Sequence, residues 1–250
     1  MNYLEEINFY FPIHSQTSDE DKVFLLKTSR LIKERAGSYS YLEIGSFFGG
    51  TLVPFLMDNA CVDVLSVDER EKHILDERGV RLNYTGVTSG SMIDKISGHG
   101  ISTTKLRVHD GSIDTVADNG AKYDLIFIDG EHTDAACFKD FIWSISKLKE
   151  NGIVLFHDSS FIFKAITMAT EFLKAQKIKH SFWKVGQSDM AGLFIGNYAD
   201  EPFEEIFGYL QDWGFFCRFS EDNLIKNLFW NRLSLTYNVE IKEHPTFKTY

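Results

Sequence analysis

Residues 41–52, Y-L-E-I-G-S-F-F-G-G-T-L, constrain the fold more than any other stretch of this 250-residue chain. A short apolar run ends in an acid and a glycine, a turn with further glycines follows, and a helix is expected to begin after it. Glycine has no Cβ and tolerates positive φ, so the turn at Gly45, Gly49 and Gly50 can bring its backbone against a ligand. The sequence therefore predicts a strand, a loop that holds a small molecule, and a helix.

The glycine spacing narrows the choice of ligand. The P-loop pattern G-x-x-x-x-G-K-[ST] fails because Thr51 follows Gly50, so no lysine reaches a phosphate. The dinucleotide pattern G-x-G-x-x-G is not met either, because the spacing is Gly45-x-x-x-Gly49-Gly50, and a nicotinamide cofactor becomes the alternative. Asp68 ends the next apolar run, C-V-D-V-L-S-V-D, roughly 20 residues after Gly45, where an acid binds ribose hydroxyls in such folds.

Together with Asp68, E-I-G-S-F-F-G-G-T resembles the first motif of the class I S-adenosylmethionine-dependent methyltransferases, an acid followed by Gly-x-x-x-Gly. H-D-G-S at 109–112, Y-D-L-I-F-I-D-G-E-H at 123–132 and N-G-I-V-L-F-H-D at 151–158 look like that family's adenine loop, fourth strand and fifth strand. The D-x-x-H pattern, followed by a strand ending in H-D, is most similar to the macrocin O-methyltransferase and cephalosporin-hydroxylase-like group. Many of that group act on sugar hydroxyls with a divalent metal. The resemblance covers roughly residues 38–196.

The resemblance implies an α/β, Rossmann-like methyltransferase fold with a mainly parallel seven-stranded sheet, flanking helices and an antiparallel last strand. It implies S-adenosylmethionine as the cofactor and a small-molecule acceptor, such as a sugar or another natural product. The residues expected to bind the cofactor are Glu43, Gly45, Ser46, Gly49, Thr51, Asp68, Asp110, Gly111, Ser112 and Asp129.

Asp129, His132 and Asp158 are the residues that could carry chemistry. Asp129 and Asp158 end two apolar runs that we expect to be neighbouring strands, and His132 lies three residues past the first. A sugar-like hydroxyl has a pKa roughly like that of water, ~15.7, whereas a histidine titrates near ~6.5. Since His132 alone faces a gap of about nine pKa units, a metal would help.

Mg²⁺ takes oxygen ligands, so we expect Asp129 and Asp158 to bind it and His132, beside Asp129, to be the general base. His157 departs from the pattern, because an acid can precede the last aspartate in the resembling metal-dependent enzymes. A histidine there leaves the site one negative charge short for a hard cation. The sequence therefore leaves open whether the reaction requires Mg²⁺.

The absence of several sequence motifs reduces the number of alternative functions for this chain. No Y-x-x-x-K occurs, so the tyrosine and lysine of short-chain dehydrogenases are absent, although another NAD(P)-dependent oxidoreductase stays possible. No proline stands directly after the fourth strand, so the N-P-P-Y motif of nucleic-acid amino-methylating enzymes is absent. A binding module that keeps the cofactor without turnover is a third reading. A non-catalytic module would be expected to lack one of the catalytic residues, but Asp129, His132 and Asp158 are all present.

Composition agrees with a small-molecule enzyme. The net charge of −10 opposes attraction to a polyanion, so no nucleic-acid partner is expected. Cys61, Cys137 and Cys217 form no C-x-x-C pair, so neither a disulfide framework nor a zinc site is indicated. No apolar run approaches the ~18 residues that span a bilayer, so no membrane partner is expected. We expect a cytoplasmic protein with reduced thiols. The oligomeric state is open, with a homodimer as one alternative.

Apolar runs alternate with longer amphipathic segments, which is typical of βαβ units. Strands are expected near 41–45, 62–67, 104–108, 123–128, 152–157, 181–186 and 191–196, and helices near 49–58, 88–96, 134–148 and 161–176. Asn151-Gly152 is expected to be the turn that closes the helix near 134–148. We expect one domain over 1–250, with a core at about 38–196, an N-terminal helical segment at 1–37 and an aromatic-rich appendage at 198–250. We expect this appendage to cover the substrate side of the cleft.

Overall fold

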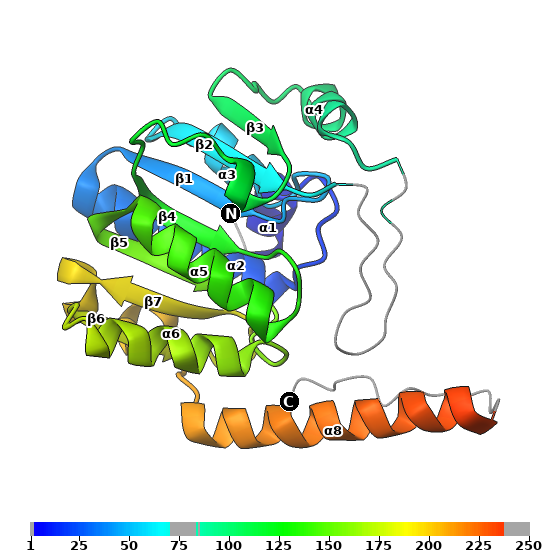
Figure 1. The fold of residues 1–250 in the computed structure, drawn as a ribbon. Helices are drawn as coiled ribbons and strands as arrows, with labels where there is room; N and C mark the ends of the chain where they lie inside the picture. Colours follow the sequence, from blue (N-terminus) through cyan, green and yellow to red (C-terminus); the bar gives the residue numbers. More distant parts are fainter. Residues whose placement is uncertain (1–2, 71–83, 85, 238–250) are drawn as a thin grey trace.

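The computed structural model describes residues 3–70, 84 and 86–237, and within them the side chains of 5–70, 84 and 86–226 (Figure 1). Its centre is a seven-stranded sheet in the order β3-β2-β1-β4-β5-β7-β6. Neighbours from β3 to β5 are parallel, and β7 is antiparallel to both β5 and β6. The strands are β1 (Tyr39–Ile44), β2 (Cys61–Asp68), β3 (Leu106–Asp110), β4 (Tyr123–Ile128), β5 (Leu148–Phe156), β6 (His180–Lys184) and β7 (Ala191–Ile195). All seven predicted strands and the antiparallel last strand are confirmed.

Helices cover both faces of the sheet and make three layers (Figure 1). Every residue of β1 and β4 is buried, as expected for parallel strands that are covered on both sides. Alternate residues face opposite layers: Tyr41 packs with the helices of one face, and Leu42 with α5 and α6 on the other. The helices are α1 (Tyr3–Tyr10), α2 (Asp19–Ala36), α3 (Val53–Met57), α4 (Ser89–Gly98), α5 (Asp134–Lys147), α6 (Phe163–Ala175), α7 (Phe203–Phe207) and α8 (Trp213–Tyr237).

Two local predictions differ from the structure. The helix expected near 49–58 is only α3, Val53–Met57, because Gly49 has φ 78° and the chain turns until Pro54 stands in the first helical turn. The predicted turn at Asn151-Gly152 is wrong, since both residues lie inside β5, which follows α5 directly. The pairing of β4 with β5 shifts register between Tyr123 and Leu125, so the extra residues are absorbed within the sheet.

The sheet places the predicted site residues at one edge. Ile44 pairs with both Val67 and Ile128, and Ile128 pairs with Phe156, so the chain leaves β1, β2, β4 and β5 at the same level. Ligands of open parallel sheets bind outside these carboxyl ends. The loops that follow the strands are therefore the candidate site.

The C-terminal appendage packs through α7 on α2 and through α8 on α6, not over the candidate site. The Trp213 ring lies 4.6 Å from that of Phe182 on β6, and its Nε1 donates to Thr167 Oγ1 on α6 at 3.3 Å. None of residues 198–226 lines the main cavity, so for these residues the prediction of a substrate cover is wrong. The aromatic residues Phe229 and Trp230 lie outside the described side chains.

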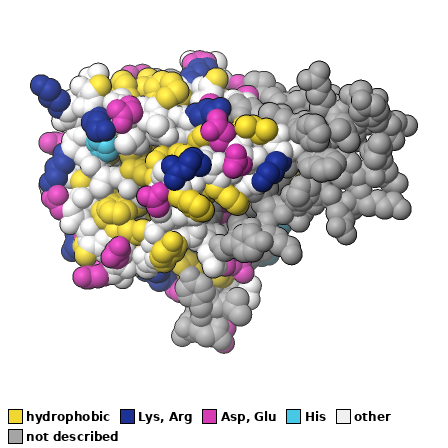
Figure 2. Space-filling model, turned by 90° about the horizontal axis from the view of Figure 1, so that it is seen from below, with side chains coloured by type: hydrophobic (Ala, Val, Ile, Leu, Met, Phe, Trp, Pro, Cys, Tyr) yellow, Lys and Arg dark blue, Asp and Glu magenta, His cyan; other side chains and the backbone are white. Residues whose placement is uncertain are grey.

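Apolar side chains form small groups between charged ones on the face seen from below (Figure 2). Phe215 and Phe219 of α8 are exposed, at 56% and 41%. Within the described residues, no helix has the length and hydropathy needed to cross a membrane.

Candidate active site

A cavity lies at the carboxyl ends of the central strands. Eight of the predicted site residues line it: Gly45, Ser46, Thr51, Asp68, Gly111, Ser112, Asp129 and His132. Four others, Glu43, Gly49, Asp110 and Asp158, do not line it. The structure therefore divides the predicted residues into those that face the cavity and those that support them.

The glycine loop after β1 owes its shape to close backbone packing. Gly45 has φ 87°, and a Cβ there would lie 2.0 Å from the carbonyl oxygen of Asp129. A Cβ on Gly50 would lie 2.7 Å from the carbonyl oxygen of Ile13, because the segment before α2 packs on the loop. Gly49 faces side chains of α4 and not the cavity. Gly45 thus holds the ends of β1 and β4 together beside the cavity.

Glu43 is completely buried behind the loop. Its carboxylate accepts hydrogen bonds from Tyr41 OH at 2.5 Å and from Thr51 Oγ1 at 2.6 Å. Burial raises the pKa of Glu43 to about 8, although both hydrogen bonds act in the opposite direction. Glu43 therefore supports Thr51 and the loop from behind.

Asp68 fixes the same loop from the end of β2. Its Oδ2 accepts from the backbone N–H groups of Ser46 and Phe47 at 2.9 and 2.8 Å. Phe47 has φ 47°, a left-handed conformation that these hydrogen bonds help to hold. Burial raises the pKa of Asp68, while Arg70 and the two amides oppose that rise. Asp68 also lines the cavity, in the position expected for a ribose acceptor.

Arg70 connects the ends of β2 and β3, and the sequence reasoning missed it. Its side chain is only 2% exposed, and Nη1 donates to Asp110 Oδ1 at 2.6 Å. Nη2 donates to Ser66 Oγ at 2.7 Å, and that hydroxyl donates to Ser46 Oγ at 2.9 Å. Asp110 is therefore engaged by Arg70 and is half exposed outside the main cavity.

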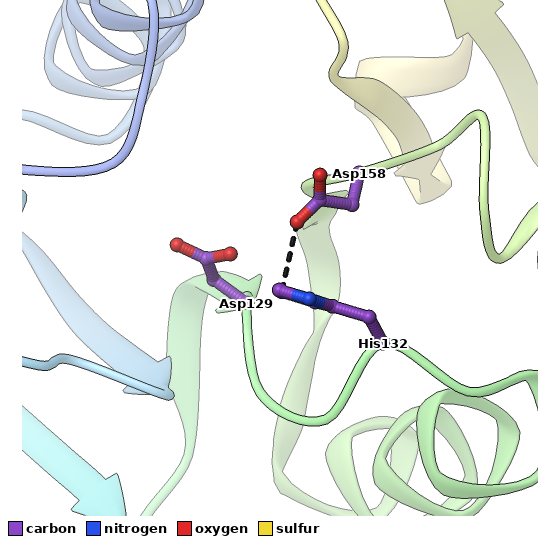
Figure 3. A group of neighbouring side chains, drawn as sticks. All are labelled: Asp129, His132 and Asp158. Carbon is purple, nitrogen blue, oxygen red and sulfur yellow. Dashed lines mark ion pairs between the residues drawn. The ribbon is translucent and has the colours of Figure 1, made fainter. Parts of the chain in front are cut away.

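Asp129, His132 and Asp158 meet at the ends of β4 and β5 (Figure 3). His132 Nε2 lies 2.8 Å from Asp158 Oδ2, and Asp129 points into the same space. Asp158 has φ 49°, a conformation that a non-glycine residue adopts at some energetic cost and that clusters at functional sites. The expectation that strand order would bring these three residues together is confirmed.

His157 lies among carboxylates. Its Nδ1 is 3.0 Å from Asp129 Oδ1 and 3.1 Å from Asp158 Oδ2, and its Nε2 is 3.2 Å from Asp21 Oδ2. Both ring nitrogens face acceptors, so both carry hydrogen and the ring is an imidazolium. Burial lowers the pKa of His157, but the Asp129 and Asp158 charges prevail and raise it well above the usual value.

Asp21 reaches this cluster from the first turn of α2. It forms a capping box with Ser18, and its Oδ1 accepts from Ser188 Oγ at 2.7 Å and from the Asp189 N–H at 2.9 Å. Burial raises its pKa, but the hydrogen bond from His157 and the other donors bring it down to about 2. The capping motif S-D-E-D was visible in the sequence, but nothing in it indicated a contact with His157.

Three side chains at this end offer a donor set for a divalent cation. Asp129, His132 and Asp158 each offer one ligand atom, and these atoms all lie within 4.8 Å of one another. Two carboxylates and an imidazole suit Mn²⁺ or another transition metal better than Mg²⁺, which prefers oxygen ligands. The imidazolium of His157 already offsets one of the two negative charges. With His132 as a third ligand the site would favour Mn²⁺, whereas the two carboxylates alone suit Mg²⁺ as well.

Further residues line the cavity without having been predicted. Ser15 and Gln16 come from the segment before α2, and Lys139 and Asp140 from α5. No pattern in the sequence marked them, because each reaches the cavity through the packing of its own segment on the sheet. Their contribution is visible only in the folded chain.

Comparisons with known proteins agree with this architecture. Residues 42–159 match a family model described as a methyltransferase domain. The O-methyltransferase NovP is similar in structure at 9% identity, with 72% of this chain and 81% of that chain covered and a TM-score of 0.59. The O-methyltransferase TomG from Streptomyces achromogenes, in complex with S-adenosylmethionine, gives 14% identity, 79% and 91% coverage and a TM-score of 0.53.

An O-methyltransferase from Bacillus cereus, in complex with S-adenosylhomocysteine, is similar at 16% identity, with 77% of this chain and 90% of that chain covered and a TM-score of 0.52. A comparison with curated proteins gave no match. At these low sequence identities, the structural similarity supports the assignment of the fold alone. The predicted Rossmann-like methyltransferase fold is confirmed.

Proposed function

We infer that this chain is a class I S-adenosylmethionine-dependent methyltransferase, and we propose that its acceptor is a hydroxyl group of a small molecule such as a sugar or another natural product. The methyltransferase-domain match over residues 42–159 supports methyl transfer. NovP and TomG, which share the fold, are O-methyltransferases, and TomG was crystallised with S-adenosylmethionine. The observation that carries the proposal for a hydroxyl acceptor is the His132–Asp158 pair, 2.8 Å apart beside the cavity.

The loops after β1, β2 and β3 would hold the methyl donor. Asp68 lines the cavity where a ribose would lie, and its two hydrogen bonds to the loop amides keep the Gly45 turn in place. Thr51, supported by Glu43, lines the part of the cavity formed by that turn. Holding donor and acceptor in line removes much of the entropic barrier of a two-substrate reaction.

His132 would act as the general base. A neutral imidazole that donates Nε2–H to Asp158 has its basic lone pair on Nδ1, and Asp158 would stabilise the imidazolium that forms. In the transfer, the acceptor oxygen forms a bond to the methyl carbon as the bond from that carbon to sulfur breaks. The hydroxyl proton passes to His132, and S-adenosylhomocysteine is the second product.

Asp129 and Asp158 are the residues that would hold a divalent cation. Such a cation, when bound, would make the acceptor hydroxyl more acidic. The chain's own residues orient this end of the site, since His157 fixes both carboxylates and Asp21 fixes His157. The fit of the donors supports a role for metal, and chelation tests it.

A binding and turnover experiment tests the proposal. Isothermal titration of the purified chain should give binding of S-adenosylmethionine with Kd on the order of 1 μM, or about −8 kcal/mol, and no binding of NAD or NADP. Incubation with methyl-labelled cofactor and a panel of sugars and phenols should then transfer label to an acceptor. Binding of NAD without binding of S-adenosylmethionine would overturn the proposal in favour of an oxidoreductase. Tight cofactor binding with a fully assembled site but no transfer to any hydroxyl would favour a binding module.

The cytoplasmic location, the absence of nucleic-acid partners and the oligomeric state stay predictions from the sequence. Native mass spectrometry of the purified chain would separate a monomer from the homodimer. The same spectrum would show whether a metal ion is retained on purification.

A further inference from the structure

Asp140 is a cavity-lining acid that the proposed mechanism does not use. It lies on α5, and burial raises its pKa to about 7, with Lys139 acting in the opposite direction. Its Oδ2 approaches within 3.4 Å of the position that a Cβ on Gly130 would occupy. In the described part of the chain, neither a hydrogen bond nor an ion pair reaches its carboxylate. Such a group is costly to bury and is relieved by a donor from a ligand.

Asp140 lines the same cavity as the loop after β3, and Asp114, which follows that loop, is among the charges that act on it. Gly111 and Ser112 follow β3, at the loop that resembles the adenine loop of the methyltransferases, and Ile113 comes directly after them. Val67 and Ile113 line the cavity and belong to the apolar cluster that packs against α5. Ala136, one turn before Asp140, lines it as well. A flat base fits apolar walls of this kind, with a polar edge directed at α5.

The acid expected for this role is engaged elsewhere. Asp110 accepts a hydrogen bond from Arg70 at 2.6 Å, its side chain is 50% exposed, and it does not line the main cavity. The charge of Arg70 is already shared with Asp110 and Asp68. Asp68 is assigned to the ribose, and Asp140 is a further cavity-lining carboxylate that keeps its acceptor capacity for a ligand.

We propose that Asp140 recognises the adenine ring of the cofactor by accepting a hydrogen bond from its 6-amino group. This deepens the proposed function, because it rests on S-adenosylmethionine being the cofactor. Asp140 is thereby a selectivity residue for the base and has no part in the methyl-transfer chemistry. A site built to bond a donor rejects analogues that lack it, since the buried acceptor is then left unpaired.

Base-modified forms of the product test the proposal. Kd would be measured by calorimetry for S-adenosylhomocysteine, for the analogue with unsubstituted purine, and for the 6-oxo analogue with hypoxanthine. In the unmodified chain, the two analogues should bind on the order of 10- to 100-fold more weakly. Asp140→Ala should lose a similar factor for S-adenosylhomocysteine and almost nothing for the purine analogue. Asp140→Asn, which presents an N–H, should shift preference toward the 6-oxo analogue.

Asp110→Asn is the matched control, because it changes the acid that the sequence assigns to adenine. It should leave the discrimination between the three ligands unchanged. Equal losses for all three ligands in Asp140→Ala, with an unchanged melting temperature, would overturn the proposal, as would loss of discrimination in Asp110→Asn alone. If the unmodified chain binds none of the three ligands, the cofactor assignment itself fails, and that outcome is distinct from a failure of Asp140.

Discussion

The two ends of the cavity use their acids differently. At the β4–β5 end, Asp129, Asp158 and Asp21 surround one imidazolium, His157, and Asp158 also bonds His132, so each of these acids already has a partner within the chain. At the β2–β3 end, Arg70 pairs with Asp68 and Asp110. The cavity-lining carboxylate of Asp140, which lies beside Gly130 with Asp114 and Glu69 among its charged neighbours, accepts no hydrogen bond and forms no ion pair within the described residues.

The difference indicates a division of labour. Groups that act on the reacting atoms need fixed positions before the substrate arrives, because reorganisation during the reaction raises the barrier. Groups that select a ligand gain most when the ligand supplies the missing partner. The β4–β5 end is pre-assembled, and the β2–β3 end is completed by what binds there.

Loss of His132 should have the largest effect, because it removes the base from the pre-assembled end. We expect His132→Ala to lower kcat by about 10²- to 10⁴-fold with little change in the Kd of S-adenosylmethionine. Initial rates and calorimetry measure the two quantities. His180→Ala, on β6 far from the cavity, is the control and should keep full activity. A loss of cofactor affinity as large as the loss of kcat would contradict the division between the two ends.

Asp68 tests the opposite end. Asp68→Ala removes the ribose acceptor and both hydrogen bonds to the loop amides, so cofactor Kd should rise by roughly 10- to 100-fold. Asp63→Ala, on the same strand but paired with Arg107, should bind the cofactor normally. If Asp68→Ala lowers kcat at saturating cofactor and leaves Kd unchanged, the assignment of this end to binding is wrong.

Asp21 tests how far the pre-assembled network contributes to stability. Its pKa is about 2 in the folded chain, below the value of an unfolded aspartate. Its contribution, on the order of 2 kcal/mol, is therefore fully present above about pH 4 and is lost as pH falls through about 2. Urea unfolding from pH 7 down to pH 2 should show this acid loss in the unmodified chain and a flatter dependence in Asp21→Asn.

Ser18→Ala separates the charge of Asp21 from its role in capping α2. This variant breaks the hydrogen bond from the Asp21 N–H to Ser18 Oγ but keeps the contact with His157. It should be less stable at every pH and retain the acid dependence. An identical pH dependence in Asp21→Asn and in the unmodified chain would contradict the assigned role.

His157 tests whether the internal cation limits metal binding. His157→Asp replaces one positive charge by a negative charge beside Asp129 and Asp158, so Mn²⁺ should bind on the order of 10-fold more tightly. His157→Asn is the neutral control and should give an intermediate affinity. In the unmodified chain we expect EDTA to lower turnover and Mg²⁺ or Mn²⁺ to restore it; restoration by Mn²⁺ alone would indicate that His132 is a ligand of the cation. Full activity after exhaustive chelation would show that no metal is required, so that His132, held by Asp158, deprotonates the acceptor without one.

Asp140 should give the smallest effect, a pH dependence of cofactor binding. Because its pKa is about 7 before binding and the proposed hydrogen bond favours the ionised form, affinity should rise a few-fold as pH increases from 6 to 8. Lys139, Glu131, Asp114 and Glu69 surround it and are the other charges that act on it. Asp140→Asn should remove the dependence, and its persistence there would assign the titration to another group.

Much of the fold and part of the site could be predicted before the structure. The seven apolar runs were predicted as strands, because strands buried on both faces must be continuously apolar. Asp129, His132 and Asp158 were predicted to meet, because parallel strands bring their carboxyl ends to one edge. The Gly45 turn was predicted to bring its backbone against a ligand, since the absence of a Cβ allows a close approach; it lines the cavity, but the space that its missing Cβ leaves is taken by the backbone of Asp129. Each of these follows from a local pattern together with a general rule of sheet topology.

Tertiary structure alone decided the rest. Asp21 and Asp140 lie on helices whose amphipathic pattern marks a buried side but not the group on the other side of the contact. The engagement of Asp110 by Arg70, and of His157 by three carboxylates, depends on distances between segments up to 136 residues apart. Asn151-Gly152 has the composition of a turn but lies within β5, where Gly152 pairs with Ile195 of β7 and Asn151 Oδ1 accepts from the Asn197 N–H. Local sequence records the preferences of neighbours in the chain, whereas the charge and hydrogen-bond state of a buried group is set by its neighbours in space.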